Sequence, residues 1–438
     1  MPEQYSIRGR SSTEIAGTVE EAIRAGRFAP GAKLPPIRSL AAELAVSPMT
    51  VASAYRDLRR RGLLTAAGRR GTRVSERPPL PVRTAPVVPA NARDLVTGNP
   101  DPELLPSLTP AVRRLRPGKR LYGGAANAEG LVELARSEFA RDGIAAPAIA
   151  VVGGALDGIE RALVAHLRVG DAIAVEDPGF PRVFDLVRAL GLEAAPVSVD
   201  DFGPRPEALE RSLQRGVRAV LLTPRAQNPT GAALDARRAR ELCRVLDGHP
   251  DVLVLEDDHA ALLAGVPALT VCAPERPHWV VVRSVSKALG PDLRVAVMTG
   301  DDTTIARVEG RQLLGTGWVS HVLQELVLDL WSCEGELVAR AAQAYRDRRD
   351  ALLSALAERG ISAHGRSGLN VWVPVDEEVA TATALLERGW AVDGGERYRI
   401  RSSPAIRITI ATLRPEEAPR LAADVAAALA VGARTYSA

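Results

Sequence analysis

Four short segments of the sequence hold residues that could act together on one small molecule. They contain Lys287 (Ser-Val-Ser-Lys), Asn228 (Asn-Pro-Thr-Gly), Asp257 (Glu-Asp-Asp) and Gly154 (Gly-Gly-Ala-Leu). A lysine amine condenses with an aldehyde, a carboxylate keeps a pyridine nitrogen protonated, and backbone amides that open a helix bind phosphate. A pyridoxal phosphate (PLP) site needs these groups, and the four segments together could supply them.

The elements that must position these residues alternate between strand-like and helix-like runs. Short apolar runs rich in β-branched residues occupy residues 148–152, 172–175, 219–222, 252–255 and 279–282. Such runs are typical of strands buried on both faces, and their alternation with helical patterns predicts an α/β domain with a mostly parallel sheet. The Ala-rich C-terminal stretch predicts a terminal helix.

The order of these motifs resembles that of the fold-type I aminotransferases, which have a large domain with a mostly parallel sheet and a small C-terminal α+β domain. The resemblance implies that Lys287 is the Schiff-base lysine, that Asp257 pairs with the pyridinium nitrogen, and that Asn228 donates to the ring hydroxyl. It implies further that the phosphate is bound by Ser284, Ser286, Arg294, the amides of Gly154, Ala155 and Leu156, and Tyr122 from the partner subunit.

Three more residues matter to the implied site. Phe180, after Glu-Asp-Pro-Gly, would stack on the ring, and Arg407, in Ile-Arg-Ile, would grip an α-carboxylate through its bidentate fork. Where most aminotransferases place a tyrosine after the aspartate, this chain has His259. A histidine could donate the same hydrogen bond to the ring hydroxyl, but its titration near neutral pH would tune the site differently. The residues therefore predict PLP binding without predicting efficient transamination.

A second group of motifs lies before residue 76. Apolar residues at helical spacing predict a helix capped by Ser12, a second helix over 37–44, and a third that begins at Pro48 with Ser47 as its cap. After Gly62 the pattern predicts two short strands around a Gly-Arg-Arg-Gly tip. Tyr55 is expected in the core between the helices.

The stretch from Leu34 to Val51 resembles the GntR-type winged helix-turn-helix. The resemblance implies DNA contacts from Arg38, Ser47, Thr50 and the wing arginines Arg69 and Arg70. Pro48 departs from the pattern, since many relatives carry an arginine there, so the motif predicts DNA binding but not the target sequence.

A proline-rich stretch separates the two groups of motifs. Five prolines between residues 76 and 93 exclude a helix or a central strand. We therefore expect a DNA-binding domain at 1–75, a linker at 76–93 and a PLP-binding domain at 94–438, with its small subdomain at about 335–438. Residues 1–76 hold 13 Lys and Arg against 7 Asp and Glu, while the rest holds 43 against 46. A basic head on a slightly acidic body favours a polyanion as the partner of the head.

A GntR-type head joined to a fold-type I body is identified as the architecture of the MocR family of transcriptional regulators. Five stretches resemble its PtsJ-like branch, which is associated with pyridoxal kinase and vitamin B6 supply: residues 98–102, 175–178, 257–259, 283–294 and 318–321. The resemblance implies a regulator that senses PLP, binds double-stranded DNA and controls vitamin B6 metabolism or salvage. It also implies a homodimer with head-to-tail arrangement, acting in the cytoplasm.

Two other functions stay open at this point. One is a PLP-dependent aminotransferase acting on amino acids, with a secondary DNA-binding head. The other is a regulator that senses an amine bound to PLP as an external aldimine. The sequence names neither the operator nor the regulated genes, nor does it say whether PLP strengthens or weakens DNA binding.

Composition narrows the class of protein. Hydrophobic residues make up 46% and charged residues 25% of the 438 residues, as is typical of globular proteins. No apolar run reaches the roughly 18–20 residues that span a bilayer, and Met1–Arg10 carries no secretory signal. The three cysteines are odd in number and far apart, which predicts neither disulfides nor a metal site and favours a reducing cytoplasm.

Overall fold

The structure is a computed structural model that describes residues 7–60, 62–66, 71–75 and 88–435. Residues 1–84 belong to one compact unit and most of the later residues to a second, and each unit is described by itself. Residues 68–70 of the predicted wing tip and residues 76–87 of the predicted linker lie outside the described residues.

The N-terminal unit is a three-helix domain with a small antiparallel sheet. Its elements are α1 (Ser12–Arg24), α2 (Ile37–Glu43), α3 (Pro48–Arg60), β1 (Leu64–Ala66) and β2 (Thr72–Val74). Ile15, Leu40 and Leu58, on the three helices, are fully or almost fully buried together. The helices and the paired strands are therefore those that the sequence predicts.

Two details of this unit concern the helix starts. The prediction of Ser12 as the first cap is wrong by one residue, because Ser11 is the cap and its Oγ accepts from the Glu14 amide at 3.2 Å. Ser47 does cap α3, with its Oγ accepting from the Thr50 amide at 3.1 Å. Tyr55 is fully buried, as expected, and its hydroxyl donates to the Pro35 carbonyl at 3.0 Å, which ties α3 to the turn before α2.

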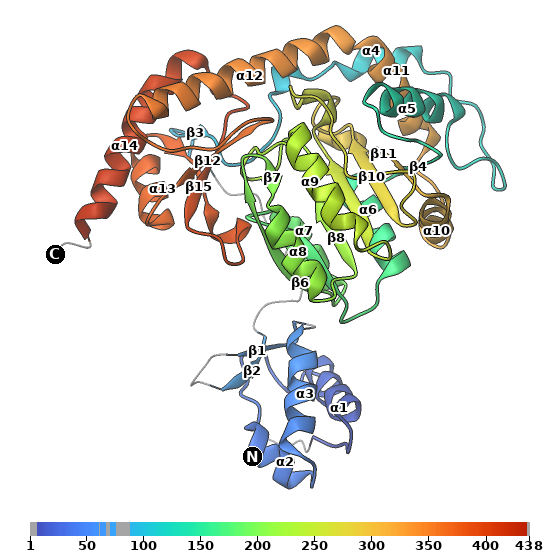
Figure 1. Cartoon of the computed structure of the whole chain (residues 1–438), viewed down its shortest axis with the longest axis vertical. Coiled ribbons are helices and arrows are strands. Elements are labelled where there is room, and N and C mark those ends of the chain that lie inside the picture. Colours follow the sequence, from blue (N-terminus) through green and yellow to red (C-terminus); the bar gives the residue numbers. More distant parts are fainter. Residues whose placement is uncertain (1–6, 61, 67–70, 76–87, 436–438) are drawn as a thin grey trace. The chain divides into compact units, whose positions relative to one another are not determined.

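An eight-stranded sheet forms the centre of the second unit (Figure 1). Its strand order is β4-β11-β10-β9-β8-β5-β6-β7. The strands are β4 (Ala148–Val152), β5 (Ala172–Asp177), β6 (Glu193–Asp200), β7 (Gly203–Pro204), β8 (Ala219–Leu222), β9 (Leu253–Asp258), β10 (Trp279–Ser284) and β11 (Ala296–Gly300). β10, β9, β8 and β5 run parallel, whereas β11 runs antiparallel to both of its neighbours. The sheet is thus mostly parallel where the predicted site residues lie.

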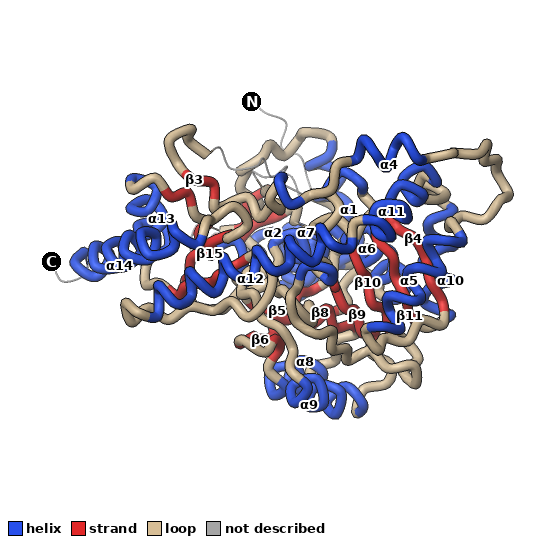
Figure 2. The backbone as a smooth tube through the Cα atoms, turned by 90° about the horizontal axis from the view of Figure 1, so that it is seen from above, coloured by secondary structure: helices blue, strands red, loops and turns tan. Residues whose placement is uncertain are grey.

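Helices lie on both sides of this sheet, as the view from above shows (Figure 2). They are α4 (Leu108–Arg114), α5 (Glu129–Arg141), α6 (Ala155–His166), α7 (Pro181–Ala189), α8 (Pro206–Gln214), α9 (Ala236–Asp247), α10 (Asp302–Leu313) and α11 (His321–Cys333). Short 3₁₀ turns occupy Pro102–Leu104, Ala261–Leu263, Pro291–Leu293, Gly395–Tyr398 and Pro415–Glu417. Because both faces of the sheet are covered, its central strands are largely apolar, and β5, β9 and β10 carry their polar residues at their carboxyl ends.

The C-terminal part forms a smaller α+β layer. It contains α12 (Gly335–Ala357), β12 (Asn370–Pro374), α13 (Glu378–Glu387), β13 (Trp390–Ala391), β14 (Asp393–Gly394), β15 (Ala405–Thr409) and α14 (Ala418–Thr435). β12, β15 and β14 make an antiparallel sheet, and β13 pairs in parallel with β3 (Arg93–Asp94). Arg93, the last residue of the predicted linker, therefore already pairs with the small C-terminal layer. A two-residue strand gives no signal in the sequence. Among the described residues no helix is both long and apolar enough to cross a bilayer.

Candidate functional site

The predicted site residues converge where the parallel strands end. Asp257 is the fifth residue of β9, and Lys287 follows the end of β10, which pairs in parallel with β9. Asn228 follows β8, the neighbour of β9 on its other side. Since the carboxyl ends of parallel strands share one edge of a sheet, the fold collects these residues in one region, where α/β proteins bind ligands.

Lys287 is partly buried. Its Nζ donates to the carbonyl of Gly98 at 2.6 Å. Burial, with the charge of Arg407 as a smaller cause, lowers the pKa of Lys287 to about 8. A sizeable share of the amine is therefore neutral near physiological pH, which is the form that attacks an aldehyde.

Asp257 is a buried carboxylate without a partner. Its Oδ1 has no hydrogen-bond partner among the described residues, and its side chain is almost fully buried. Burial, together with the charges of Asp258 and Glu176, raises the pKa of Asp257 to about 7. A buried acceptor of this kind is costly unless a donor or a cation meets it. A protonated pyridine nitrogen would do so, and the residue therefore fits PLP.

Asn228 and His259 have partners within the chain. Asn228 Oδ1 accepts from Arg407 Nη1 at 3.2 Å and lies 3.5 Å from Asn370 Nδ2. His259 Nε2 lies 2.9 Å from the carbonyl of Ala226, so in the neutral ring this nitrogen carries the proton.

The expectation that His259 titrates near neutral pH is not met. Burial, helped by the charge of Lys287, lowers its pKa to about 4. At neutral pH the ring is uncharged, and its remaining nitrogen accepts hydrogen bonds rather than donating them. The burial of His259, which directly follows β9, could not be read from the sequence.

A cradle for an anion lies between β4 and α6. Gly154, at the N-terminus of α6, has a φ of 108°, and a Cβ there would lie 2.5 Å from Arg294 Nη2. Arg294, itself at a φ of 49°, donates to the Gly153 carbonyl at 3.2 Å. Ser284 Oγ donates to Ser286 Oγ at 2.9 Å. Helix-terminal amides next to a guanidinium and two hydroxyls suit a phosphate, and only glycine lets the arginine approach so closely.

Phe180 and Tyr122, the two aromatic residues of the predicted site, differ in their exposure to solvent. Phe180 is partly buried, just before α7. Tyr122 is 94% exposed and meets Trp318 edge to face, with 5.6 Å between the ring centroids. Tyr122 and Trp318 line a pocket of about 720 Å³ together with residues of the α10–α11 connection. Because nearly all of the Tyr122 side chain is exposed within one chain, its predicted role needs a partner subunit.

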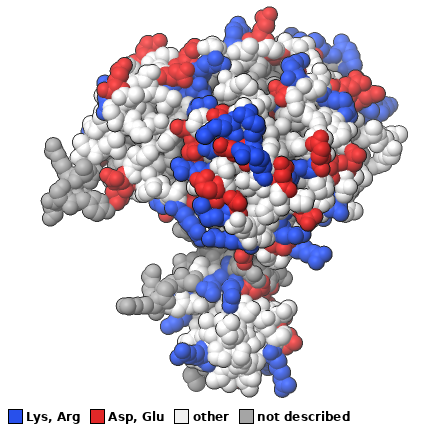
Figure 3. Space-filling view, in the orientation of Figure 1, with Lys and Arg blue, Asp and Glu red and all other residues white. Residues whose placement is uncertain are grey.

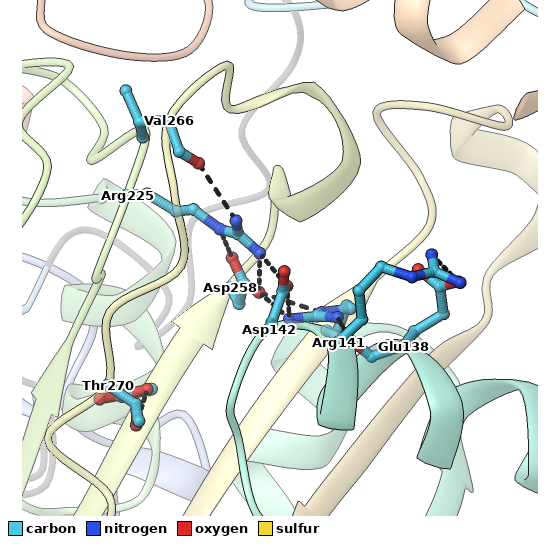
Figure 4. A network of polar contacts seen from close by, with 9 residues as sticks. Glu138, Arg141, Asp142, Arg225, Asp258, Val266 and Thr270 are labelled. Atoms are coloured by element: carbon cyan, nitrogen blue, oxygen red, sulfur yellow. Dashed lines mark hydrogen bonds and ion pairs between the residues drawn. The ribbon is translucent and has the colours of Figure 1, made fainter. Parts of the chain in front are cut away.

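A buried ionic network lies behind the strand ends, and the sequence interpretation missed it (Figure 4). Asp258 accepts from Arg225 Nε at 2.8 Å and from Arg283 Nε at 3.0 Å. Asp142 accepts from both arginines, at 3.0 and 2.6 Å. Against the cost of burial, the hydrogen bonds of Arg225 and the charge of both arginines keep the pKa of Asp258 below its usual value. The signal was the charged Arg283 within an otherwise apolar strand.

This network gives the neighbouring carboxyls opposite roles. Asp257 and Asp258 are adjacent in β9, so their side chains point to opposite faces of the sheet. Asp258 is ionised and neutralised by Arg225 and Arg283, which fixes the strand end and the loop that carries Asn228. Asp257, on the other face, has an Oδ1 without a hydrogen-bond partner among the described residues.

The head presents a different surface. Arg38 and Ser47 are exposed and Thr50 is partly exposed, while Arg69 and Arg70 lie outside the described residues. Met49, which the sequence interpretation passed over, is 69% exposed in the first turn of α3. An apolar side chain at that place can contact a thymine methyl group. The face of the head seen in Figure 3 is largely uncharged, with several basic side chains and few acidic ones.

No group of three or more potential metal-binding side chains occurs in the part of the chain that the structure describes.

Two family descriptions match the chain. Residues 11–74 match the gntR family of bacterial regulatory proteins, and residues 123–425 match aminotransferase class I and II. Together they cover the three-helix head and most of the second unit.

Two relatives match this chain over nearly its whole length and nearly the whole of their own. The chain is 43% identical over 434 residues to the vitamin B6 salvage pathway transcriptional repressor PtsJ of Salmonella typhimurium, covering 97% of this chain and 99% of the relative. It is 30% identical to the HTH-type transcriptional regulator TauR of Rhodobacter capsulatus, covering 96% and 97%.

Solved structures resemble the second unit. Aspartate aminotransferase from Thermus thermophilus with maleate is 26% identical, with a TM-score of 0.66 over 76% of this chain and 90% of that chain. The α-aminoadipate aminotransferase LysN from the same organism, complexed with N-(5'-phosphopyridoxyl)-L-leucine, is 22% identical, with a TM-score of 0.69 over 78% and 93%. The second unit therefore has the fold-type I aminotransferase fold.

Proposed function

The chain belongs to the MocR family of GntR-type transcriptional regulators with a PLP-binding aminotransferase domain, and we propose that it senses PLP to repress genes of vitamin B6 salvage. The observation that carries the proposal is the end-to-end similarity to a repressor of that pathway. The site supports it, because a buried lysine amine, an unpartnered buried carboxylate and a phosphate cradle meet at one sheet edge.

The residues would divide the binding of PLP among them. When bound, PLP supplies an aldehyde for a lysine amine and a pyridine ring that withdraws electrons. Lys287 offers a partly neutral amine, and Asp257 offers a negative charge where a protonated ring nitrogen would lie. Asn228 and His259 would lie on the side of the ring hydroxyl. The phosphate would be bound by Ser284, Ser286, Arg294 and the amides of Gly154, Ala155 and Leu156, with Phe180 stacking on the ring.

A short segment connects the lysine to the predicted linker. Lys287 donates to the carbonyl of Gly98, and residues 94–98 follow the predicted linker directly in the chain. Lys287 cannot keep this hydrogen bond unchanged once its amine is used for the cofactor. The change at Gly98 therefore lies within a few residues of the segment that joins the two domains, which gives PLP a physical route to bias DNA binding.

The proposed assembly is a head-to-tail homodimer that acts on double-stranded DNA in the bacterial cytoplasm. It is supported by Tyr122, which is exposed within one chain and would reach the phosphate site of a partner. Two heads per dimer would bind paired half-sites, with contacts from Arg38, Ser47, Thr50, Arg69 and Arg70.

Fluorescence anisotropy tests the proposal. The purified apoprotein is mixed with labelled DNA from upstream of its own gene and of nearby vitamin B6 genes, and PLP is titrated in. We expect the DNA affinity to change with PLP in the wild type and in Lys119→Ala, and not in Lys287→Ala. The chain has three lysines, so Lys119, which is exposed, is a matched control in the second unit.

The same samples test the site. Lys287→Ala should lose the absorption band of lysine-bound PLP while its circular dichroism stays that of the wild type. Specific DNA binding that ignores PLP would refute PLP as the signal. Retention of the band in Lys287→Ala would refute the assigned lysine.

A further inference from the structure

We propose that Asp393 occupies Arg407 as an internal carboxylate, so that the ligand side of the PLP site discriminates against amino acids and other carboxylates. The proposal rests on the proposed function in one respect, because it assumes that this site binds PLP. The sequence predicts that Arg407 binds the carboxylate of a ligand. We propose instead that Asp393 prevents this by pairing with Arg407 itself.

The backbone places the two side chains together. β14 and β15 pair antiparallel, and Asp393 is the direct partner of Arg407 in the register. Cross-strand partners have neighbouring side chains on the same face of a sheet. The ion pair between Arg407 Nη2 and Asp393 Oδ2 measures 3.4 Å. This contact therefore follows from strand pairing rather than from a flexible surface side chain.

Both Nη atoms of the Arg407 guanidinium are engaged within the chain, whereas its Nε has no hydrogen-bond partner among the described residues. Its Nη2 also donates to the carbonyl of Val96, and its Nη1 donates to Asn228 Oδ1 at 3.2 Å. The guanidinium carbon lies 4.8 Å from the ring centroid of Tyr398. Bidentate binding of a carboxylate needs two parallel free N–H groups. A ligand that used Nε together with Nη2 would have to displace the Val96 carbonyl or Asp393 from Nη2.

Asp393 is itself held in place. Its Oδ2 accepts from the hydroxyl of Tyr398 at 2.5 Å and from Arg397 Nη2. The Asp393 side chain is almost fully buried, whereas that of Arg397 is 35% exposed. Arg397 therefore interacts with the same Asp393 oxygen as Tyr398 does, and solvent partly screens its charge.

The carboxylate of a ligand would compete with Asp393 for Arg407, and Asp393 has the advantage. Asp393 is tethered, so it pays no translational or rotational entropy to reach the guanidinium. A second carboxylate brought beside it would be a like charge in a buried place. The amino group of a ligand meets no such obstacle, because Arg407 and Asp393 affect only the binding of the ligand's carboxylate. We therefore expect an amino acid to gain nothing from its carboxylate at this site.

The test compares two amines that differ only in a carboxylate. The PLP-loaded full-length protein is titrated with L-alanine or with ethylamine, and the half-saturation concentration is read from the change in cofactor absorption. For the wild type we expect the two values to agree within about threefold. For Asp393→Asn we expect L-alanine to bind about tenfold or more tightly than in the wild type, with ethylamine unchanged.

A second measurement needs no loaded cofactor. Succinate should leave the melting temperature of the wild-type apoprotein unchanged and raise that of Asp393→Asn, because the variant frees the buried arginine. If Asp393→Asn fails to fold, Arg407→Gln replaces it, and the alanine-to-ethylamine ratio should stay within about threefold of the wild-type ratio.

The outcomes separate this proposal from the function on which it rests. A wild type that binds L-alanine tenfold more tightly than ethylamine refutes it, as does a ratio that collapses in Arg407→Gln or is unaltered in a folded Asp393→Asn. A protein without any PLP absorption band refutes the proposed function instead, and succinate on the apoprotein then still tests Asp393.

Discussion

Three buried carboxyls at the strand ends show how one type of residue acquires different roles. Burial raises the pKa of Glu176, Glu256 and Asp257 to about 7 in each case. Glu176 accepts from the Thr223 amide at 3.0 Å, and Glu256 accepts from the Val271 amide at 2.6 Å. Only Asp257 of these three has a buried oxygen without a hydrogen-bond partner among the described residues. Asp257 is thus the one of the three whose buried oxygen still needs a donor or a cation, as the proposed site requires.

Replacement of Asp257 by asparagine should weaken PLP binding by about 10–100-fold, because a hydrogen bond to a charged group contributes about 1.5–3 kcal/mol. Titration of the apoprotein with PLP, followed by absorption, measures the change. Asp251→Asn, at an exposed position, is the control and should bind as the wild type does. Equal affinity in Asp257→Asn would show that this carboxylate does not face the ring nitrogen.

The same substitution has a predictable pH dependence in the apoprotein. A carboxyl whose pKa is raised in the folded state holds a proton there that the unfolded chain has lost, so its contribution to stability falls as pH rises from about 4 to about 7. The free energy of unfolding of Asp257→Asn minus that of the wild type should therefore increase between pH 5 and 7.5. Taking the difference cancels the histidines, whose shifts are common to both proteins. A constant difference would contradict the raised pKa.

At the scale of elements, function depends on where strands and helices end. β5, β9 and β10 are longer than the apolar runs that predicted them, because each includes polar residues at its carboxyl end. α6 begins directly after Gly154, whose positive φ turns the chain from β4 into the helix. In the head, the turn between α2 and α3 presents the start of α3 to solvent.

Gly154→Ala should lower PLP affinity by more than about tenfold, since the new methyl group would lie 2.5 Å from Arg294 Nη2 and φ is positive there. Titration with PLP and with inorganic phosphate, followed by the melting temperature, measures both losses. Gly310→Ala in α10 is the matched control, because no atom lies within 4 Å of its Cβ. If Gly154→Ala binds phosphate as the control does, the cradle is elsewhere.

Arg38→Ala should weaken specific DNA binding by about 1–3 kcal/mol and leave PLP uptake unchanged, because α2 belongs to the head alone. Anisotropy at several salt concentrations measures the loss. Arg237→Ala, an exposed arginine of α9, should bind DNA as the wild type does. An unaltered operator affinity in Arg38→Ala would mean that another face of the head contacts DNA.

At the scale of the whole molecule, the second unit exposes apolar residues near Tyr122. Leu121 is 81% exposed, Leu313 63%, Leu314 87% and Val322 46%. Leu313 and Val322 line the same pocket as Tyr122, and Leu121 and Leu314 are the chain neighbours of Tyr122 and Leu313. Exposed apolar surface of this kind is typical of subunit interfaces. It supports the proposed homodimer, in which each phosphate site receives Tyr122 from the partner.

Leu314→Glu should therefore convert the dimer to a monomer at micromolar concentration, because a buried unpaired charge at an interface is strongly unfavourable. Size-exclusion chromatography with light scattering measures the mass. Val379→Glu, at a 73% exposed position of α13, is the control and should remain dimeric. A Leu314→Glu protein that stays dimeric would place the interface on another surface.

The sequence by itself determined the elements and the residue types of the site. The spacing of apolar residues, the helix-cap residues and the short apolar runs were sufficient to predict the three head helices, the two wing strands and the parallel strands. These elements follow from the local pattern of side chains. The order of the motifs around Lys287 and Asp257 was likewise sufficient for the cofactor class.

Tertiary structure decided what surrounds each residue. The pairing of β14 with β15 sets Asp393 against Arg407, and the packing of α5 against the sheet brings Asp142 to Arg225 and Arg283. Burial at the end of β9 makes His259 neutral. These contacts join residues far apart in the chain, and hydrogen bonding and desolvation depend on neighbours in space. Sequence spacing carries no record of them, so the chemistry of this site is a property of the fold.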